Sequence, residues 1–157
     1  YFDDEGVATN KKAIIKNGVL ETYLYTLQTA AIDNVEPTGN GYRGSGKAHV
    51  STSLITIKPG RKSEKELIST IEEGVYINDL EGLHAGMNAQ SGDFSLKAEG
   101  FVIKDGKLDR PLDIVTISGN LMKLFADIVA VGSDVKVFSS ATSCPSVVIR
   151  KLAVSGK

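Results

Sequence analysis

The sequence has few of the residues that metal sites and disulfide frameworks need: its 157 residues include one Cys, two His and no Trp. A single Cys excludes a disulfide scaffold and any zinc site built from several thiolates. No apolar run approaches the roughly 20 residues of a membrane-spanning helix. Lys and Arg number 18 and Asp and Glu 19, so the formal net charge is −1, with no basic footprint for nucleic acid. The composition therefore predicts neither a nucleic acid nor a membrane as partner.

What remains is the composition of a globular protein. Hydrophobic residues make up 41% and charged residues 24%, and a mass of 16.7 kDa is the size of one domain. We expect a single domain over residues 1–157. The chain opens on Tyr1-Phe2-Asp3-Asp4-Glu5-Gly6, with neither a Met start nor a signal peptide, so we expect it to be a fragment of a longer chain.

Two β-hairpins are predicted from the same turn chemistry. Ile15–Leu20 (IKNGVL) and Ile103–Leu108 (IKDGKL) each place Asn-Gly or Asp-Gly between apolar β-formers. Both turn positions need positive φ, which these residues adopt readily. The likeness between the segments has two explanations, an internal duplication or the same turn chosen twice, and we favour the second.

The sequence predicts short helices at Thr26–Asp33, Ser63–Gly74 and Leu121–Asp127. Ser63 and Glu66 form a capping-box pattern, and Asn120 is placed to cap the third helix. Roughly eight strands are expected, the longer ones at Ala48–Ile57, Val75–Leu80, Phe94–Ile103, Leu112–Ile117, Val135–Phe138 and Ser146–Val154.

The predicted strands are interrupted at two places, one by a loop and one by a β-bulge. Asn34–Lys47, with Pro37 and four glycines, is expected to be a loop, and a phase shift across Glu99-Gly100 predicts a β-bulge. The predicted class is α+β: a mostly antiparallel β-sheet domain with two or three short helices.

The glycine-rich segment 39–47 matches two nucleotide-binding patterns. Gly39–Gly44 fits G-x-G-x-x-G, and Gly41–Lys47 fits G-x-x-x-x-G-K. A phosphate loop must follow a strand and open a helix, whereas this segment follows Pro37 and leads into a β-branched strand. The patterns therefore do not indicate nucleotide binding.

Three residues could hold a metal if the fold gathered them. His49, His84 and Cys144 would suffice for a zinc site in a self-sufficient metallohydrolase, although their spacing fits no zinc motif. A catalytic triad could be assembled from Ser91, His84 and Asp93 by residue type. No G-x-S-x-G nucleophile motif supports it, and closeness in sequence does not establish the required geometry. An ordinary polar role for the histidines and a small buried hydrophobe at Cys144 are the simpler interpretations.

Five sequence blocks together resemble the C-terminal half of TldD/PmbA proteins, and they occur in the family's order and spacing. The blocks are Phe2–Val7, the Pro59-Gly60 stop with the Ser63–Ile68 helix start, Ser91–Ser95, Ile117–Asn120 and Ala130–Asp134. They span nearly the whole chain, so the resemblance identifies the chain as a member of this family.

The resemblance implies a cytoplasmic metallopeptidase-type protein, of the family once called modulators of DNA gyrase. The family is linked to proteolysis of unfolded peptides and maturation of modified ones, and it works as a homodimer or as a heterodimer with a TldD-type subunit. In the catalytic subunit an upstream H-E-x-x-x-H motif and a C-terminal Cys hold zinc, which activates water for peptide cleavage. The substrate is expected to be an unfolded or extended peptide that adds to a sheet edge.

The chain departs from the catalytic pattern. It contains no H-E-x-x-x-H, and Cys144-Pro145-Ser146 leads straight into the last strand, where TldD-type chains have a segment like C-G-K-E-G-Q. This connection resembles PmbA, so the ligand role is not carried onto Cys144, which stays a weak metal candidate. We expect no catalytic or metal residue in this chain, with zinc possible in the parent protein or its partner subunit. Whether the parent is an enzyme stays open. The alternative is a non-catalytic subunit that supplies a dimerisation and peptide-presenting scaffold.

Overall fold

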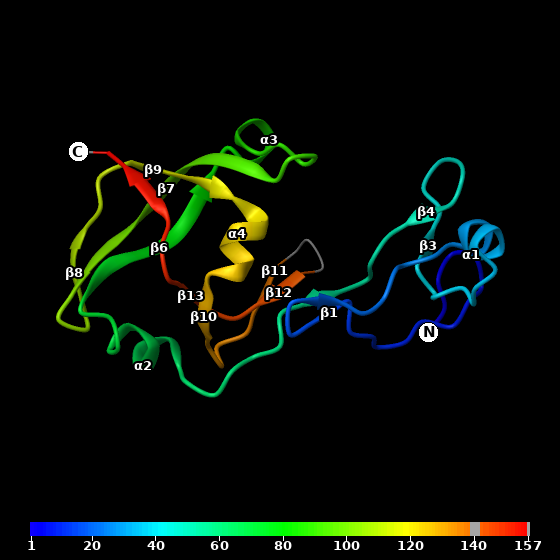
Figure 1. Cartoon of the computed structure of the whole chain (residues 1–157), viewed down its shortest axis with the longest axis horizontal. Helices are drawn as coiled ribbons and strands as arrows, with labels where there is room; N and C mark the ends of the chain where they lie inside the picture. Colours follow the sequence, from blue (N-terminus) through cyan, green and yellow to red (C-terminus); the bar gives the residue numbers. More distant parts are fainter. Residues whose placement is uncertain (139–141, 157) are drawn as a thin grey trace. The chain divides into compact units, whose positions relative to one another are not determined.

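The computed structural model describes residues 1–138 and 142–156, which form a chain of short helices and antiparallel strands (Figure 1). The helices are α1 (Leu27–Asp33), α2 (Glu64–Ile68), α3 (Leu83–Gly86) and α4 (Leu121–Ala126). The strands are β1 (Ile15–Lys16), β2 (Val19–Leu20), β3 (Gly41–Tyr42), β4 (His49–Val50), β5 (Ile55–Thr56), β6 (Glu73–Glu81), β7 (Asp93–Lys104), β8 (Lys107–Pro111), β9 (Val115–Asn120), β10 (Ile128–Val131), β11 (Lys136–Phe138), β12 (Thr142–Cys144), β13 (Val147–Ile149) and β14 (Ala153–Ser155). The predicted α+β class with mostly antiparallel sheet is confirmed.

The chain divides into two compact units. Of the described residues, unit 1 holds Tyr1–Ile55 and Thr142, and unit 2 holds Thr56–Phe138 and residues 143–156. Unit 1 contains the hairpins β1–β2 and β3–β4 and the helix α1. The helix predicted at Thr26–Asp33 is present as α1, and Thr26 caps it: its side chain accepts from the Thr29 amide, and the Thr29 side chain accepts from the Thr26 amide.

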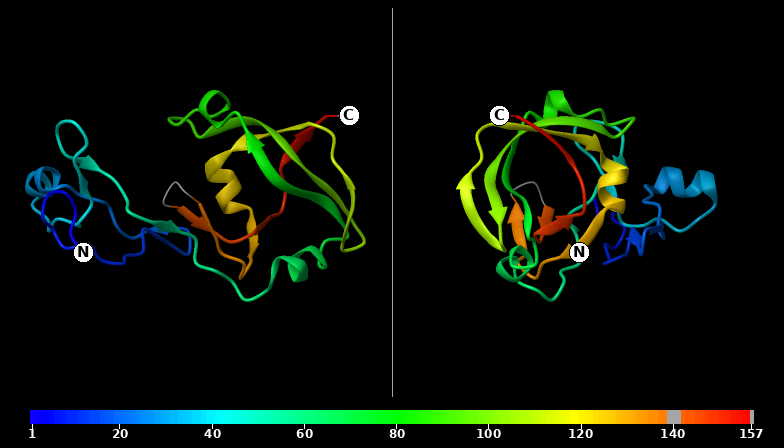
Figure 2. Two further views of the ribbon diagram at one scale, coloured as in Figure 1. Left: turned by 180° about the vertical axis from the view of Figure 1, so that it is seen from behind. Right: turned by 60° about the vertical axis from the view of Figure 1, so that its left-hand side comes forward.

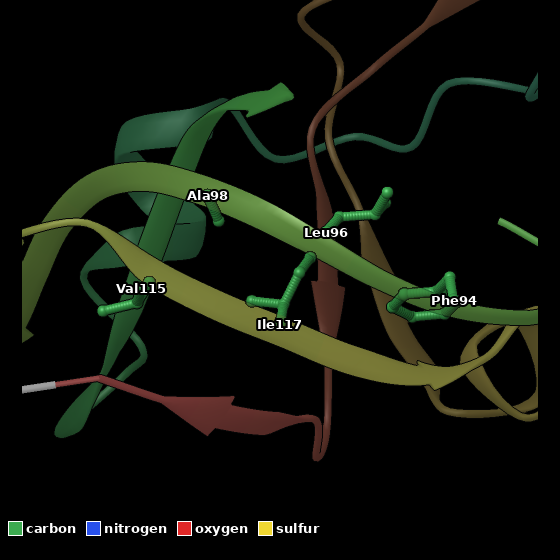
Figure 3. Packing of buried hydrophobic residues seen from close by; sticks show 5 residues of the cluster. All are labelled: Phe94, Leu96, Ala98, Val115 and Ile117. Atoms are coloured by element: carbon green, nitrogen blue, oxygen red, sulfur yellow. The ribbon is translucent and has the colours of Figure 1, made fainter. Parts of the chain in front are cut away.

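Unit 2 is built on a curved five-stranded antiparallel sheet (Figure 2). The strand order is β14-β9-β7-β6, and β8 also pairs with β7. The central strand β7 carries Phe94, Leu96 and Ala98 on one face, and β9 adds Val115 and Ile117 to form the buried core (Figure 3). Alternation from Phe94 to Ala98 therefore places every second side chain of this part of β7 in the core.

Both hairpin turns form as predicted. Asn17 and Gly18 have φ of 52° and 79°, and Asp105 and Gly106 have φ of 49° and 72°. The two segments share a turn but differ in context, because β1–β2 is an isolated pair whereas β7–β8 extends the main sheet.

The predicted β-bulge is present, but its extra residue lies on the neighbouring strand. Ile77 pairs with Gly100 and Asp79 pairs with Glu99, so Asn78 of β6 has no partner on β7. The phase shift in the β7 sequence therefore marks the place of the irregularity and not the strand that carries it.

The helix predicted at Ser63–Gly74 is shorter than expected. Its start is confirmed, with the Ser63–Glu66 capping box in place, but α2 ends at Ile68 and β6 begins at Glu73. The hydroxyls of Ser69 and Thr70 donate to helix carbonyls at 2.8 and 2.7 Å, and such local bonds compete with continuation of the helix.

Two predicted long strands are each divided because their ends pair with different partners. Ala48–Ile57 becomes β4, which pairs with β3, and β5, which lies beside β12. Ser146–Val154 becomes β13, which pairs with β10, and β14, which pairs with β9. The loop predicted at Asn34–Lys47 contains β3, and α3, β10 and β12 were not predicted at all.

In the part of the chain that the structure describes, no helix has the length and hydropathy to cross a membrane.

Candidate functional site

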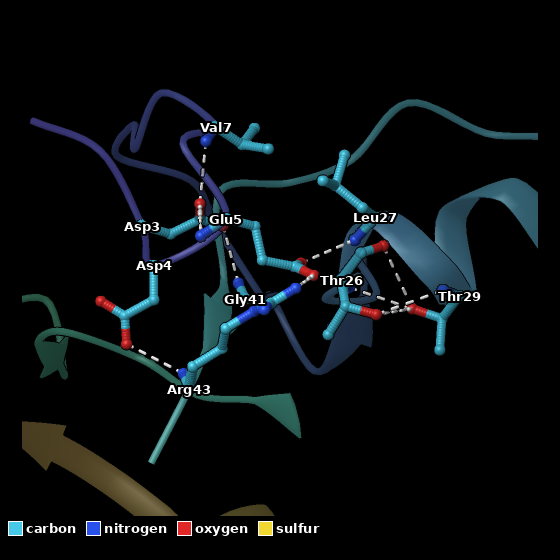
Figure 4. Close-up of polar contacts among 9 residues, drawn as sticks. All are labelled: Asp3, Asp4, Glu5, Val7, Thr26, Leu27, Thr29, Gly41 and Arg43. Atoms are coloured by element: carbon cyan, nitrogen blue, oxygen red, sulfur yellow. Dashed lines mark hydrogen bonds and ion pairs between the residues drawn. The ribbon is translucent and has the colours of Figure 1, made fainter. Parts of the chain in front are cut away.

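The acidic segment at the start of unit 1 binds backbone amides (Figure 4). The Asp3 Oδ1 atom accepts from the Glu5 and Val7 amides at 3.0 and 2.8 Å, and Oδ2 accepts from the Gly41 amide at 2.7 Å. Burial opposes ionisation of this carboxyl, but the three amides outweigh it, so the pKa of Asp3 is lowered. Asp3 thus ties two segments of unit 1 together as an ionised carboxylate.

Asp4 and Glu5 continue this role. Asp4 accepts from the Arg43 amide at 2.8 Å, and the Glu5 Oε2 atom accepts from the Leu27 amide at the start of α1, also at 2.8 Å. The Glu5 side chain is only 4% exposed, and its Oε1 atom lies 4.0 Å from the Arg43 guanidinium. A Cβ at position 41 would lie 2.1 Å from Glu5 Oε2, so Gly41 leaves the room that this carboxylate occupies.

A shallow hollow of about 690 Å³ opens beside Glu5. It is lined by Glu5, Leu27, Gln28, Arg43, Gly46, Lys47 and Ala48. The lining thus includes two cationic side chains, Arg43 and Lys47, of which Arg43 lies near the Glu5 carboxylate. This glycine-rich segment joins β3 to β4 in an antiparallel hairpin and opens no helix, so it lacks the geometry of a phosphate loop.

A second polar cluster gathers in unit 2 around Glu64, the first residue of α2. Its Oε2 atom accepts from the Ser146 hydroxyl at 2.9 Å, the Tyr76 hydroxyl at 3.2 Å and the Lys136 ammonium at 3.3 Å. Ser146 Oγ also lies 2.6 Å from Asp134 Oδ2. The cluster joins α2, β6, β11 and the segment before β13, which makes it a structural tie between elements far apart in the sequence.

Asp134 is the most constrained member of this cluster. Its Oδ2 atom also accepts from the Ser146 amide at 3.2 Å, while Oδ1 is buried with no hydrogen-bond partner among the described residues. Burial opposes ionisation, but the Ser146 hydroxyl and the nearby amides outweigh it, so the pKa of Asp134 is lowered. Gly132 makes space for this carboxylate, because a Cβ there would lie 2.2 Å from Oδ1.

Replacing the Ser146 hydroxyl is expected to weaken unit 2 in a pH-dependent way. Ser146→Ala removes a hydrogen bond to a carboxylate, which is worth about 1.5–3 kcal/mol. Because the folded pKa of Asp134 is lowered, its contribution is present above the unfolded pKa and is lost as the pH falls through the folded pKa. Urea unfolding should show the largest loss at neutral pH and a smaller one in acid. Ser155→Ala, on exposed β14, is the control, and an equal loss at both pH values would contradict this assignment.

Cys144 lies in β12, half-buried, and its surroundings disfavour the thiolate. Its Sγ atom contacts the Pro145 carbonyl at 3.2 Å. Burial and then the charge of Asp134 raise the pKa of the Cys144 thiol. Zinc-binding and nucleophilic cysteines need the opposite, a thiolate in positive surroundings.

The other candidate residues lie on separate elements. His49 lies in β4 of unit 1, with its ring edge to face with Tyr42 at 5.6 Å, whereas His84 lies in α3 of unit 2. Asp93 Oδ1 accepts from Asn120, and the Ser91 hydroxyl accepts from the Asp93 amide. No hydrogen bond among the described residues joins His84 to Ser91 or Asp93, so these three residues do not form a hydrogen-bonded triad.

The residues present do not fit a zinc ion. Within residues 1–138 and 142–156, no three His, Cys, Asp or Glu side chains gather closely enough to hold a metal. Asp3, Asp4 and Glu5 accept from backbone amides, and Glu64 and Asp134 accept from hydroxyl, amide and ammonium donors. We therefore derive no chemical step through a metal in this chain.

The sequence did not predict that the residues of these two polar clusters lie together. Glu5 contacts residues 22 and 38 positions away, and Glu64 contacts Ser146 across 82 positions. Neither periodicity nor motif spacing reports contacts of this range. The only signal was indirect, since Asp3–Glu5, Glu64 and Asp134 stood in blocks that resembled the family.

The whole described chain is similar to one known family of domains. Residues 1–156 match the family model described as the PmbA/TldA metallopeptidase C-terminal domain. A Buchnera aphidicola protein named a metalloprotease PmbA homolog is 35% identical over 158 aligned positions, covering 99% of this chain and 32% of the relative.

Solved structures of proteins from this family have a similar fold over nearly the whole chain. A Thermotoga maritima protein described as a proposed modulator of a DNA gyrase superimposes with a TM-score of 0.91 at 44% identity, over 98% of this chain and 35% of that one. TldE from Thermococcus kodakarensis superimposes with a TM-score of 0.90 at 28% identity, over 99% of this chain and 36% of that one. The chain thus spans about a third of the length of these relatives.

Proposed function

Because the chain belongs to the PmbA/TldD metallopeptidase family and matches its C-terminal domain, we propose that it is the C-terminal part of a longer, PmbA-type cytoplasmic protein that acts on extended peptides. In this proposal the domain contributes to proteolysis or peptide maturation as a sheet scaffold and binding edge, in a homodimer or beside a TldD-type subunit. Zinc, where the assembly uses it, is held outside this domain.

The environment of Cys144 is the observation that carries this proposal. It is the chain's only thiol, and burial and an acidic neighbour hold it in the neutral form. A hydrolytic metal needs three or four protein ligands, and Cys144 lies in a run that leads directly into β13. These features support the part of the proposal that places zinc outside this domain.

Strand β6 supports the peptide-binding part of the proposal. It is nine residues long, ends the strand order of the main sheet, and pairs with β7 alone among the described strands. A free strand edge offers main-chain donors and acceptors to an extended chain. Binding through the backbone would tolerate many peptide sequences, as expected for unfolded substrates.

The alternative function is a non-catalytic partner subunit that supplies a dimerisation and peptide-presenting scaffold for a TldD-type subunit. In its purely structural form this subunit only stabilises the dimer and binds no peptide itself. The hydrogen-bonded clusters around Glu5 and Glu64 favour it, since their carboxylates join distant segments of each unit. The two proposals differ in one measurable property, which is peptide affinity of this chain alone.

Fluorescence anisotropy with a labelled, unfolded casein peptide separates them. We expect the purified chain to bind the peptide without cleaving it, and cleavage to require a co-purified TldD-type subunit. Absence of binding by the chain alone would favour the scaffold alternative. Cleavage by the chain alone would contradict both.

A further inference from the structure

Unit 1 buries very little apolar surface. Ala30 is its only buried hydrophobic residue among those described. Its large apolar side chains that remain exposed are Tyr1, Phe2, Ile15, Val19, Leu20, Tyr23, Leu27, Ile32, Val35, Tyr42, Val50, Leu54 and Ile55. Ordering each residue costs about 1–2 kcal/mol of backbone entropy, which so small a core does not offset. Unit 1 therefore needs further apolar burial to be stable.

The hairpin β1–β2 shows this need most clearly. It is an isolated pair of two-residue strands, and a lone two-stranded hairpin is marginally stable in water. Ile15 and Leu20 are direct cross-strand partners, so their side chains share one face, while Lys16 and Val19 share the other. Ile15 is 60% and Leu20 50% exposed. We call the surface formed by Ile15 and Leu20 the hairpin face.

We propose that the hairpin face docks against the segment that precedes this domain in the full-length protein. The matched region is the C-terminal domain of the family and accounts for 32% to 36% of the Buchnera, Thermotoga and Thermococcus relatives. About two thirds of those chains therefore lies outside it, which supplies a permanent neighbour. The inference rests on the proposed function, since it takes the chain to be part of a longer one.

A neighbour in the same chain fits the observations better than a separate partner. Unit 1 needs its cover in order to fold, and a separate protein would leave it uncovered whenever the two dissociate. A tethered segment is present at an effective concentration of the order of millimolar at all times. The hairpin face is also uncharged, as expected for a surface that is buried permanently rather than by an exchanging partner.

Site-specific photo-cross-linking in the full-length protein tests the contact. p-Benzoylphenylalanine replaces Leu20 on the hairpin face or, as the matched control, Lys16 on the opposite face. Mixing ¹⁴N- and ¹⁵N-labelled protein before irradiation distinguishes a cross-link within one chain from one between two copies. We expect the Leu20 position to cross-link to residues that precede Tyr1 in the same chain, and the Lys16 position to give no such product.

Other outcomes overturn the inference. A Leu20 cross-link to a second copy, to another protein or to residues of this domain assigns the hairpin face to a different occupant, and absence of any product shows that it is uncovered. The anisotropy assay with the casein peptide tests the proposed function independently of this contact. A protein that binds peptide but fails the cross-link refutes only the docking contact.

Discussion

Gly100→Ala is expected to destabilise unit 2 by about 3 kcal/mol or more, because the added methyl group has no room between two paired strands. A Cβ at position 100 would lie 1.8 Å from the Tyr76 carbonyl oxygen and 3.0 Å from the Ile77 Cα atom. Both are backbone atoms of β6, so no side-chain rotation relieves the clash. Strands β6 and β7 would have to separate at the bulge, in the most extensive pairing of the sheet.

Urea unfolding measures this effect, with Gly46→Ala as the control. Gly46 meets no atom within 4 Å and has no positive φ, so alanine there should change the free energy of unfolding by less than about 1 kcal/mol. If Gly100→Ala changed the free energy of unfolding as little as Gly46→Ala does, the close approach of β6 to β7 at position 100 would be contradicted.

Leu96→Ala is expected to cost about 2–5 kcal/mol, because it removes buried methyl groups and leaves a cavity. Leu96 is 5% exposed and lies in the cluster formed by β7 and β9. The same substitution at Leu108, which is 44% exposed on β8, should stay within about 0.5 kcal/mol. Equal losses at the two positions would show that the core does not lie on this face of β7.

The sequence predicted elements whose determinants are local. The Ser63 and Asn120 caps and the Asn17-Gly18 and Asp105-Gly106 turns depend on a few adjacent residues, and each forms where it was expected. Element ends that depend on distant partners were not predictable. β4 and β5 read as one strand because nothing nearby reveals that they pair with different strands.

The candidate clusters escaped prediction for the same reason. Glu5, Asp134 and Ser146 acquire their roles from residues brought close only by the fold. Cys144 could be weighed from sequence only by its position relative to the family pattern. The structure adds a physical reason, since burial and Asp134 raise the pKa of its thiol.

If zinc is held outside this domain, Cys144 is not a zinc ligand, and the zinc content of the protein can be measured by inductively coupled plasma mass spectrometry. The purified chain is compared with its Cys144→Ala variant after dialysis against a weak chelator. We expect substoichiometric zinc in both proteins, with no difference between them. Stoichiometric zinc in the native chain that is lost in Cys144→Ala would contradict it and make Cys144 a metal ligand.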